Sequence, residues 1–213
     1  GSSQEFKLDK NLAKKAWPFI DLIQSYHRHR IYGLEHIPQE GRALIAVNHS
    51  LATYDILLLA AEVIKFTNRV PRGLGDRLLF KLPIFRKWVK EMGVVEGKMS
   101  SARSILEKEG LALVAPGGMR EALRPTTERY QLRWAKRRGF CRLALETQSP
   151  LILAACPGAD DLYTVYSNAL TKIAYRSFKI PIPLLRGWGP TLLPRPVQLT
   201  HVLSKPIIPP TMV

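Results

Sequence analysis

The sequence predicts an α/β fold, with a mostly parallel central sheet flanked by helices. Apolar runs at residues 43–47, 111–115 and 151–156 show no alternation of polar and apolar side chains. Such runs are typical of strands in a sheet that is covered on both faces. Segments of helical periodicity separate them, which is the order of βαβ units. The chain has 213 residues, of which 46% are hydrophobic, so it can bury one full core.

The N-terminal segment, Leu8 to Arg30, repeats apolar side chains at helical spacing and surrounds them with lysine and arginine. Pro18 is expected to start or kink a helix there. This basic amphipathic segment can pack on the domain, lie on an anionic membrane surface, or do both. Residues 1–3 resemble an expression remnant. We therefore separate residues 1–30 from an expected domain at 31–213.

The remaining elements are predicted from apolar patterning, caps and turn residues. In order, they are a strand at 30–34, a turn at 37–41, a strand at 43–47, a helix at 53–65, a strand at 69–74, a helix at 78–92, a strand at 93–95, a helix from Ser100 or Ser101 to Glu109, a strand at 111–115, a helix at 133–147, a strand at 151–156 and a late strand at 196–203. Neither a signal peptide nor an apolar run long enough to span a bilayer is expected.

The chain is strongly basic, with a net charge of +15 and a pI of about 10.1. Such a charge predicts a polyanionic partner. A concentrated basic stretch comprises Arg120, Arg124, Arg129, Arg133, Lys136, Arg137, Arg138 and Arg142. It is either a solvated helix face or a docking surface for an anionic donor or lipid headgroups, with Arg133, Arg137 and Arg138 as its centre. Nucleic acid is not expected, because aromatic residues do not interleave with the basic clusters.

The cysteines and most histidines predict no chemistry. Cys141 and Cys156 fall in apolar segments, so we expect buried free thiols and a reducing compartment. The histidines at positions 27, 29, 36 and 201 make no spacing pattern of metal ligands, so no metal is expected.

A histidine and a carboxylate follow the first long buried strand. His49 lies two residues after the strand at 43–47, and Asp55 lies six positions further on. Ligands of such sheets bind beyond the carboxyl ends of the strands. A carboxylate can fix the tautomer of an imidazole that acts as a general base. The pair is therefore either a catalytic base with its orienting carboxylate, or a strand-end histidine beside an unrelated helix cap.

The strand at 111–115 is followed by Gly117, Gly118, Arg120 and Glu121. Glycines at a strand end let a ligand approach the backbone and leave N–H groups free to donate. An arginine there suits a phosphate or carboxylate. A glycine pair alone is more often a simple turn. Beside a strand-end histidine, we expect these four residues to form the substrate-binding wall of a site.

The order of these blocks resembles the glycerolipid acyltransferase superfamily, of the lysophosphatidic acid acyltransferase type. Its first block is similar to Ile31-Tyr32-Gly33-Leu34-Glu35-His36-Ile37-Pro38, followed by an apolar strand, Asn48-His49 and Asp55. Pro116-Gly117-Gly118-Met119-Arg120 falls where the family has Pro-Glu-Gly-Thr-Arg, and Ser149-Pro150-Leu151-Ile152-Leu153 falls where it has a Pro-led apolar strand. The resemblance covers roughly residues 30 to 210.

Two departures from that pattern point to one branch of the superfamily. Five residues separate His49 from Asp55 where the family usually has four, and Gly117 replaces the family's glutamate. With Arg120-Glu121-Ala122-Leu123 and Arg137-Arg138-Gly139-Phe140, the chain looks more like the branch related to type 2 diacylglycerol acyltransferases. That branch acts on neutral glycerides in membranes. The extra residue leaves the geometry of the pair open.

The resemblance implies transfer of a fatty acyl group from a thioester to the hydroxyl of a lysophospholipid or a mono- or diacylglycerol. His49 would take the hydroxyl proton, Asp55 would orient His49, and N–H groups of Gly117 or Gly118 would stabilise the oxyanion. Acyl-CoA or acyl carrier protein would be the co-substrate, without a further cofactor, at the cytoplasmic face of a membrane in a peripheral or monotopic protein. A catalytically inactive lipid-binding module and a basic nucleic-acid-binding protein are the alternatives.

Overall fold

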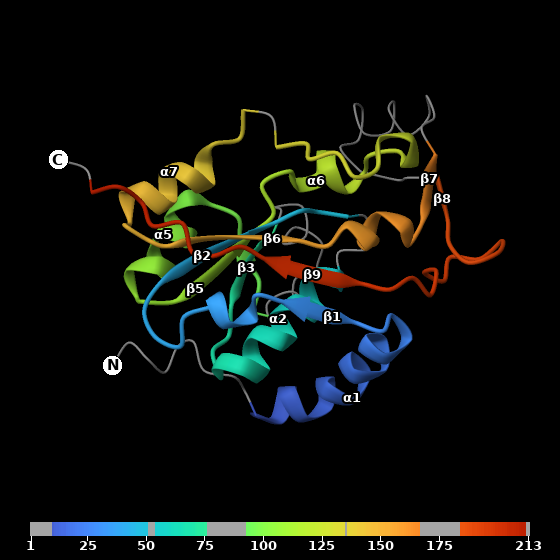
Figure 1. The fold of residues 1–213 in the computed structure, drawn as a ribbon, viewed down its shortest axis with the longest axis horizontal. Helices are drawn as coiled ribbons and strands as arrows, with labels where there is room; N and C mark the ends of the chain where they lie inside the picture. Colours follow the sequence, from blue (N-terminus) through green and yellow to red (C-terminus); the bar gives the residue numbers. More distant parts are fainter. Residues whose placement is uncertain (1–9, 51–53, 76–92, 135, 167–183, 212–213) are drawn as a thin grey trace.

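The computed structural model describes residues 10–50, 54–75, 93–134, 136–166 and 184–211. Its centre is a seven-stranded sheet in the order β1-β9-β6-β2-β5-β3-β4 (Figure 1). The strands are β1 (Arg30–Tyr32), β2 (Ala43–Val47), β3 (Arg72–Gly75), β4 (Val95–Glu96), β5 (Leu111–Val114), β6 (Leu151–Ala155) and β9 (Thr200–Leu203). All neighbours are parallel except β6 and β9. The predicted fold class is confirmed.

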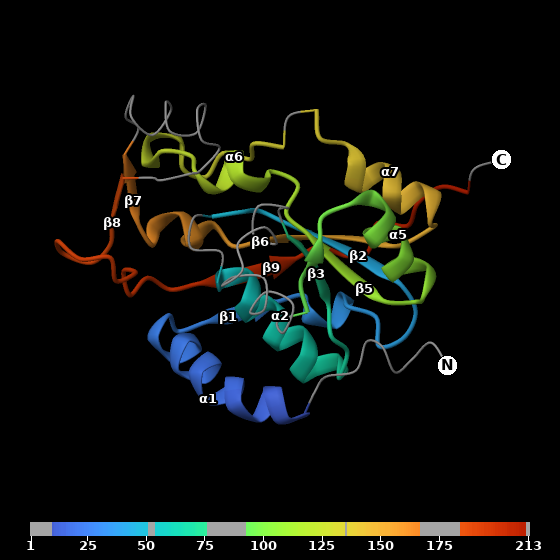
Figure 2. The same cartoon turned by 180° about the vertical axis from the view of Figure 1, so that it is seen from behind.

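Helices cover both faces of this sheet (Figures 1 and 2). The α-helices are α1 (Lys10–Tyr26), α2 (Tyr54–Thr67), α5 (Met99–Glu107), α6 (Gly118–Ala122) and α7 (Gly139–Glu146). Short 3-10 helices are η1 (Leu34–His36), η2 (Thr126–Glu128) and η3 (Pro157–Asp161). The α1–α2 pair lies on one face, and α5 and α7 lie on the other. Among the described residues, no helix combines the length and apolarity needed to cross a bilayer.

Strand β2 lies at the centre of the sheet, and its side chains alternate between two cores. Ile45 and Val47 pack with Leu59 and Val63 of α2. Leu44 and Ala46, which face the other side of the sheet, pack with α5 and α7. All five β2 residues are fully buried, as the unbroken apolar run predicted. The strand therefore ends at a position that both helix layers fix firmly.

Several elements differ from the predictions. Helix α7 begins at Gly139 rather than Arg133, because Trp134 and Arg137 reach back to the turn after β5 instead of continuing a helix. Helix α6 and the antiparallel pair β7 (Thr164–Tyr166) and β8 (Leu184–Arg186) were not predicted. The late strand is shorter than expected. The predicted helix at 78–92 lies outside the described residues.

Candidate active site

His49 lies two residues beyond β2, at the edge where three parallel strands end together. In the register, Ala46 pairs with Val114 of β5, and Val47 pairs with Ala154 of β6. The turn after β5 and the start of η3 after β6 therefore flank His49. The preceding residue, Asn48, accepts the Cys156 N–H at 2.8 Å through its side-chain oxygen, which joins the two strand ends.

Asp55 lies in the first turn of α2 and is fully buried. Its Oδ1 accepts a hydrogen bond from Ser50 Oγ at 3.0 Å, whereas its Oδ2 is buried without a hydrogen-bond partner. The Nδ1 atom of His49 is buried without a partner as well. The structure thus brings Asp55 to the strand-end region, but bonds it to Ser50 and not to His49. The unpaired Asp55 Oδ2 and His49 Nδ1 are the two atoms that a hydrogen bond of the predicted pair would join.

Burial sets the charge states of this pair. It lowers the pKa of His49 from 6.5 to about 4, and the nearby Arg124 guanidinium acts in the same direction. Burial also raises the pKa of Asp55 from 3.8 to about 6, against the opposing effect of the Ser50 hydrogen bond. At neutral pH, His49 is therefore an uncharged imidazole that can accept a proton.

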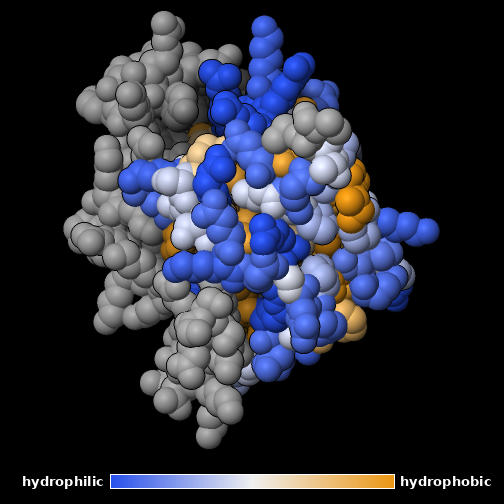
Figure 3. Space-filling view, turned by 90° about the vertical axis from the view of Figure 1, so that its left-hand side faces the viewer, coloured by the Kyte–Doolittle hydropathy of each residue, from blue (hydrophilic) through white to orange (hydrophobic). Residues whose placement is uncertain are grey.

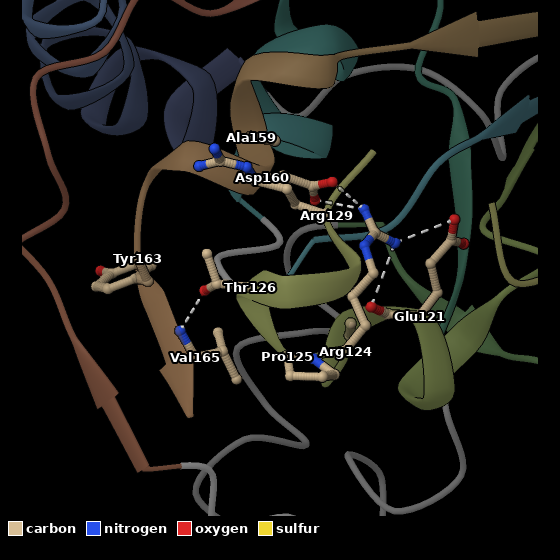
Figure 4. Close-up of a pocket in the computed structure, with 10 residues that line it drawn as sticks. Glu121, Arg124, Pro125, Thr126, Arg129, Ala159, Asp160, Tyr163 and Val165 are labelled. Carbon is tan, nitrogen blue, oxygen red and sulfur yellow. Dashed lines mark hydrogen bonds and ion pairs between the residues drawn. The ribbon is translucent and has the colours of Figure 1, made fainter. Parts of the chain in front are cut away.

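A buried ionic cluster, shown in Figure 4, contacts the backbone of His49. Arg124 lies between Asp160 and Glu121. Both carboxylate oxygens of Asp160 accept from Arg124 Nη2, and Glu121 Oε1 is 3.4 Å from Arg124 Nη1. The three side chains are 5%, 6% and 0% exposed in that order. Arg124 Nη1 also donates to the His49 carbonyl at 3.4 Å. Arg124 thus belongs to the interior and not to the basic docking surface that the sequence predicted.

Glu121 occupies the space of the glutamate that the resemblance expects at position 117. A Cβ at Gly117 would lie 1.8 Å from Glu121 Oε2. The same Oε2 accepts the indole N–H of Trp134 at 3.1 Å. Burial raises the pKa of Glu121, although Arg124 and the backbone N–H of His49 oppose this. The predicted substrate-binding carboxylate is therefore an internal group that contacts the backbone of His49.

Arg137, one of the predicted docking residues, holds the glycine turn through its guanidinium. Arg137 Nη1 donates to the carbonyls of Pro116 and Gly117 at 3.0 and 2.8 Å. Gly118 has a φ of +52°, a conformation that favours glycine. Its N–H donates to the Ala115 carbonyl at 3.0 Å. Of the two predicted oxyanion donors, only the Gly117 N–H therefore has no hydrogen bond to another described residue.

The other residues predicted to bind substrate or donor, Arg120, Arg133 and Arg138, lie at or near the protein surface. Arg120 and Arg138 are exposed, and Arg133 forms an ion pair with Glu128. Beyond the ionic cluster, an open hollow of about 610 Å³ is lined by the η2 region and β7, including Arg129. His49 is not among its lining residues.

One group of described side chains offers metal-ligating atoms. Asp55, Cys156 and His201 are all buried, and their ligand atoms lie within 4.8 Å of one another. Sequence spacing missed the group because three separate elements supply it. Both cysteines are free, as predicted, but Cys141 is only half-buried.

The sheet order, the strand-end histidine and the glycine turn together define an acyltransferase-like α/β fold. The solved lysophosphatidic acid acyltransferase PlsC of Thermotoga maritima has the same fold, with a TM-score of 0.52 and 16% identity. The match covers 95% of this chain and 74% of that structure.

The family is more specific than the fold. Residues 62–209 match the family described as "Diacylglycerol acyltransferase", and the chain belongs to that family. Relatives named "DGAT1/2-independent enzyme synthesizing storage lipids" are 28% identical in Bos taurus and in Homo sapiens, over 85% of this chain. The alignments cover 53% and 54% of those proteins, so the chain spans about half the length of the curated relatives it matches.

Proposed function

We propose that this chain carries the active site of a membrane-associated O-acyltransferase, which moves a fatty acyl group from a thioester to a glycerolipid hydroxyl. The observation that carries the proposal is His49, an uncharged imidazole at the carboxyl end of β2 beside the glycine turn. Gly117 and the storage-lipid relatives favour a mono- or diacylglycerol acceptor. A lysophospholipid is the second acceptor class, favoured by the exposed Arg120.

In the proposed reaction, the free ring nitrogen of His49 takes the proton of the acceptor hydroxyl. The hydroxyl oxygen attacks the thioester carbonyl, and the N–H of Gly117 donates to the resulting oxyanion. One such donor contributes roughly 3–4 kcal/mol in other enzymes. Collapse of the tetrahedral intermediate forms the ester and expels the thiolate, which takes the proton back from His49. No covalent acyl-enzyme is needed.

Asp55 would support the imidazolium that forms. Its Oδ2 and the Nδ1 of His49 are both buried without partners. Closing these two atoms into a hydrogen bond would satisfy both and fix the ring tautomer. Catalytic hydrogen bonds are often incomplete before substrate binds, so we propose that this contact forms in the substrate complex.

The anionic part of the donor, either coenzyme A or acyl carrier protein, would dock on the exposed arginines beside this edge. Arg120 and Arg138 are exposed, and so is Arg137, although its guanidinium also holds the glycine turn. Replacing Arg138 with alanine should raise the KM for the donor and leave kcat nearly unchanged. An unchanged KM for both acyl-CoA and the acyl carrier protein thioester would show that Arg138 is not part of the docking surface.

Exposed apolar side chains of α1 and of the segment after β8 form a surface suited to a membrane. Phe19 and Leu22 of α1 are 65% and 66% exposed, and Trp188, Leu192 and Leu193 after β8 are 59%, 69% and 61% exposed. Tyr26 at the end of α1 donates to the Pro194 carbonyl at 2.7 Å, which joins the two segments. In Figures 1 and 2, β2 points toward the end that carries β7 and β8. The described residues at the opposite end are mainly hydrophilic (Figure 3).

We propose that this surface enters the cytoplasmic leaflet and presents the strand-end site to lipid. A buried leucine contributes roughly 1.5–3 kcal/mol, so the double substitution Leu192→Ser and Leu193→Ser should weaken binding to anionic vesicles at least tenfold. Ile208→Ser is the matched control, because Ile208 is 69% exposed on the segment after β9. Equal vesicle binding by both variants would contradict the proposed orientation.

The activity test uses the purified chain, acyl-CoA or acyl carrier protein thioester, and vesicles that contain one acceptor class at a time. We expect ester formation that His49→Ala abolishes. His36→Ala is the control. His36 lies in η1 directly after β1, which runs opposite to β2, so His36 is at the other edge of the sheet from His49. Lipid binding without ester formation would favour the inactive lipid-binding module.

A further inference from the structure

Three buried side chains from different parts of the fold meet next to the proposed catalytic pair. Asp55 comes from the start of α2, Cys156 from the residue after β6, and His201 from β9. Their ligand atoms all lie within 4.8 Å of one another. We propose that these three side chains form a binding site for a divalent transition metal ion, with Zn²⁺ as the ion that fits best.

Two of these buried side chains each carry one polar atom that has no hydrogen-bond partner. Asp55, Cys156 and His201 are each 0% exposed. Asp55 Oδ2 and His201 Nε2 have no hydrogen-bond partner. An unpaired buried polar group costs free energy, and a carboxylate costs more than a neutral group. A cation held between these atoms removes that cost for both at once.

Two of the ligands, Asp55 and His201, are held by a neighbour through their other polar atom, as in metal centres. His201 Nδ1 lies 2.9 Å from His29 Nε2. If His201 donates in that contact, its Nε2 keeps a free lone pair. Ser50 holds Asp55 Oδ1 at 3.0 Å, which leaves Oδ2 free. The backbone N–H groups of Ala159 and Thr200 favour the thiolate of Cys156, although burial raises its pKa to about 12.

The three donor atoms, sulfur, nitrogen and oxygen, suit a divalent transition metal ion. One thiolate, one carboxylate and one neutral imidazole carry two negative charges, which a divalent cation neutralises. Sulfur and imidazole nitrogen suit zinc, whereas magnesium and calcium prefer oxygen ligands. Bonds of about 2.0–2.3 Å place tetrahedral zinc ligands roughly 3.3–3.8 Å apart. From separations of up to 4.8 Å, the side chains must therefore close by at most about 1.5 Å on binding.

Metal binding and catalysis would compete for one atom. Asp55 Oδ2 is the free oxygen that the metal needs, and it is also the oxygen proposed to support His49. This consequence, unlike the site itself, rests on the proposed function. It predicts that Zn²⁺ lowers the rate of acyl transfer and that a chelator restores it.

Cobalt binding tests the site without any assay of activity. The purified chain is stripped of metal and titrated with Co²⁺ under reducing, oxygen-free conditions. We expect saturation at one equivalent, with a sulfur-to-cobalt charge-transfer band, and competition by Zn²⁺. Cys141→Ser is the matched control and should bind like the wild type, whereas Cys156→Ser should lose the band. His201→Gln should weaken binding by at least tenfold, and circular dichroism checks that each variant is folded.

Two results would overturn the proposal: a wild-type chain that binds no cobalt, or a band that survives in Cys156→Ser and disappears in Cys141→Ser. His49→Ala separates this proposal from the proposed function. It should bind cobalt like the wild type and have no acyl transfer activity. Cobalt binding without any acyl transfer in the wild type would leave the metal site standing and refute the proposed reaction.

Discussion

Removal of the Arg124 guanidinium should be among the most damaging single changes in this chain. Arg124→Met keeps the volume of the side chain but leaves Glu121 and Asp160 buried without their cation. The three side chains are 5%, 0% and 6% exposed, so water cannot replace the lost partner. Breaking such a pair from one side typically costs about 3–5 kcal/mol. We expect a loss of that size in the free energy of unfolding.

Urea unfolding followed by circular dichroism measures this loss. Arg142→Met is the matched control, because Arg142 is 77% exposed and pairs with Glu146 one helical turn away. It should unfold at nearly the wild-type urea concentration. Adding Asp160→Asn to Arg124→Met should restore part of the lost stability, because it removes one unpaired charge. A loss below about 1 kcal/mol in Arg124→Met would refute the view that this cluster is sealed from water.

Two further predictions concern the glycine turn and the pH dependence of the reaction. Gly117→Ala should lower the melting temperature strongly, because its Cβ would lie 1.8 Å from Glu121 Oε2. Gly139→Ala should have little effect, because its Cβ would lie 3.7 Å from Met99 Sδ. Equal melting temperatures of the two variants would be inconsistent with this packing. Burial lowers the pKa of His49 to about 4 and raises that of Asp55 to about 6, and both groups must be deprotonated. The value of kcat/KM should therefore begin to fall at about pH 6, as Asp55 becomes protonated, and fall more steeply below about pH 4. An acid limb centred at or above about pH 6.5 would contradict these environments.

Sequence patterning predicted the parts of the fold that short-range periodicity controls. The β2 run was predicted at its observed bounds, Ala43–Val47, and β5 and β6 to within one residue. Their apolar composition has one physical explanation, burial on both faces of a sheet. The start of α7 was wrong, because Trp134 and Arg137 bond to distant atoms that no local pattern reveals.

The site was predicted by position better than by contact. Strand ends placed His49 and the glycine turn at one edge, which parallel register confirms. The partners of these residues depend on side chains far apart in sequence. Arg124 was assigned to a docking surface because of its charge, yet its ion pair with Asp160 spans 36 positions. His201 belongs to no sequence spacing of metal ligands, because the side chains near it, Asp55 and Cys156, come from other elements.

The central claim is that His49 is the general base of an acyl transfer reaction. The most direct test measures ester formation from an acyl thioester and an acylglycerol in vesicles, with wild type, His49→Ala and His36→Ala side by side. The account predicts turnover in the wild type and in His36→Ala, and a loss of at least about 100-fold in His49→Ala. Unchanged turnover in a folded His49→Ala variant would contradict it.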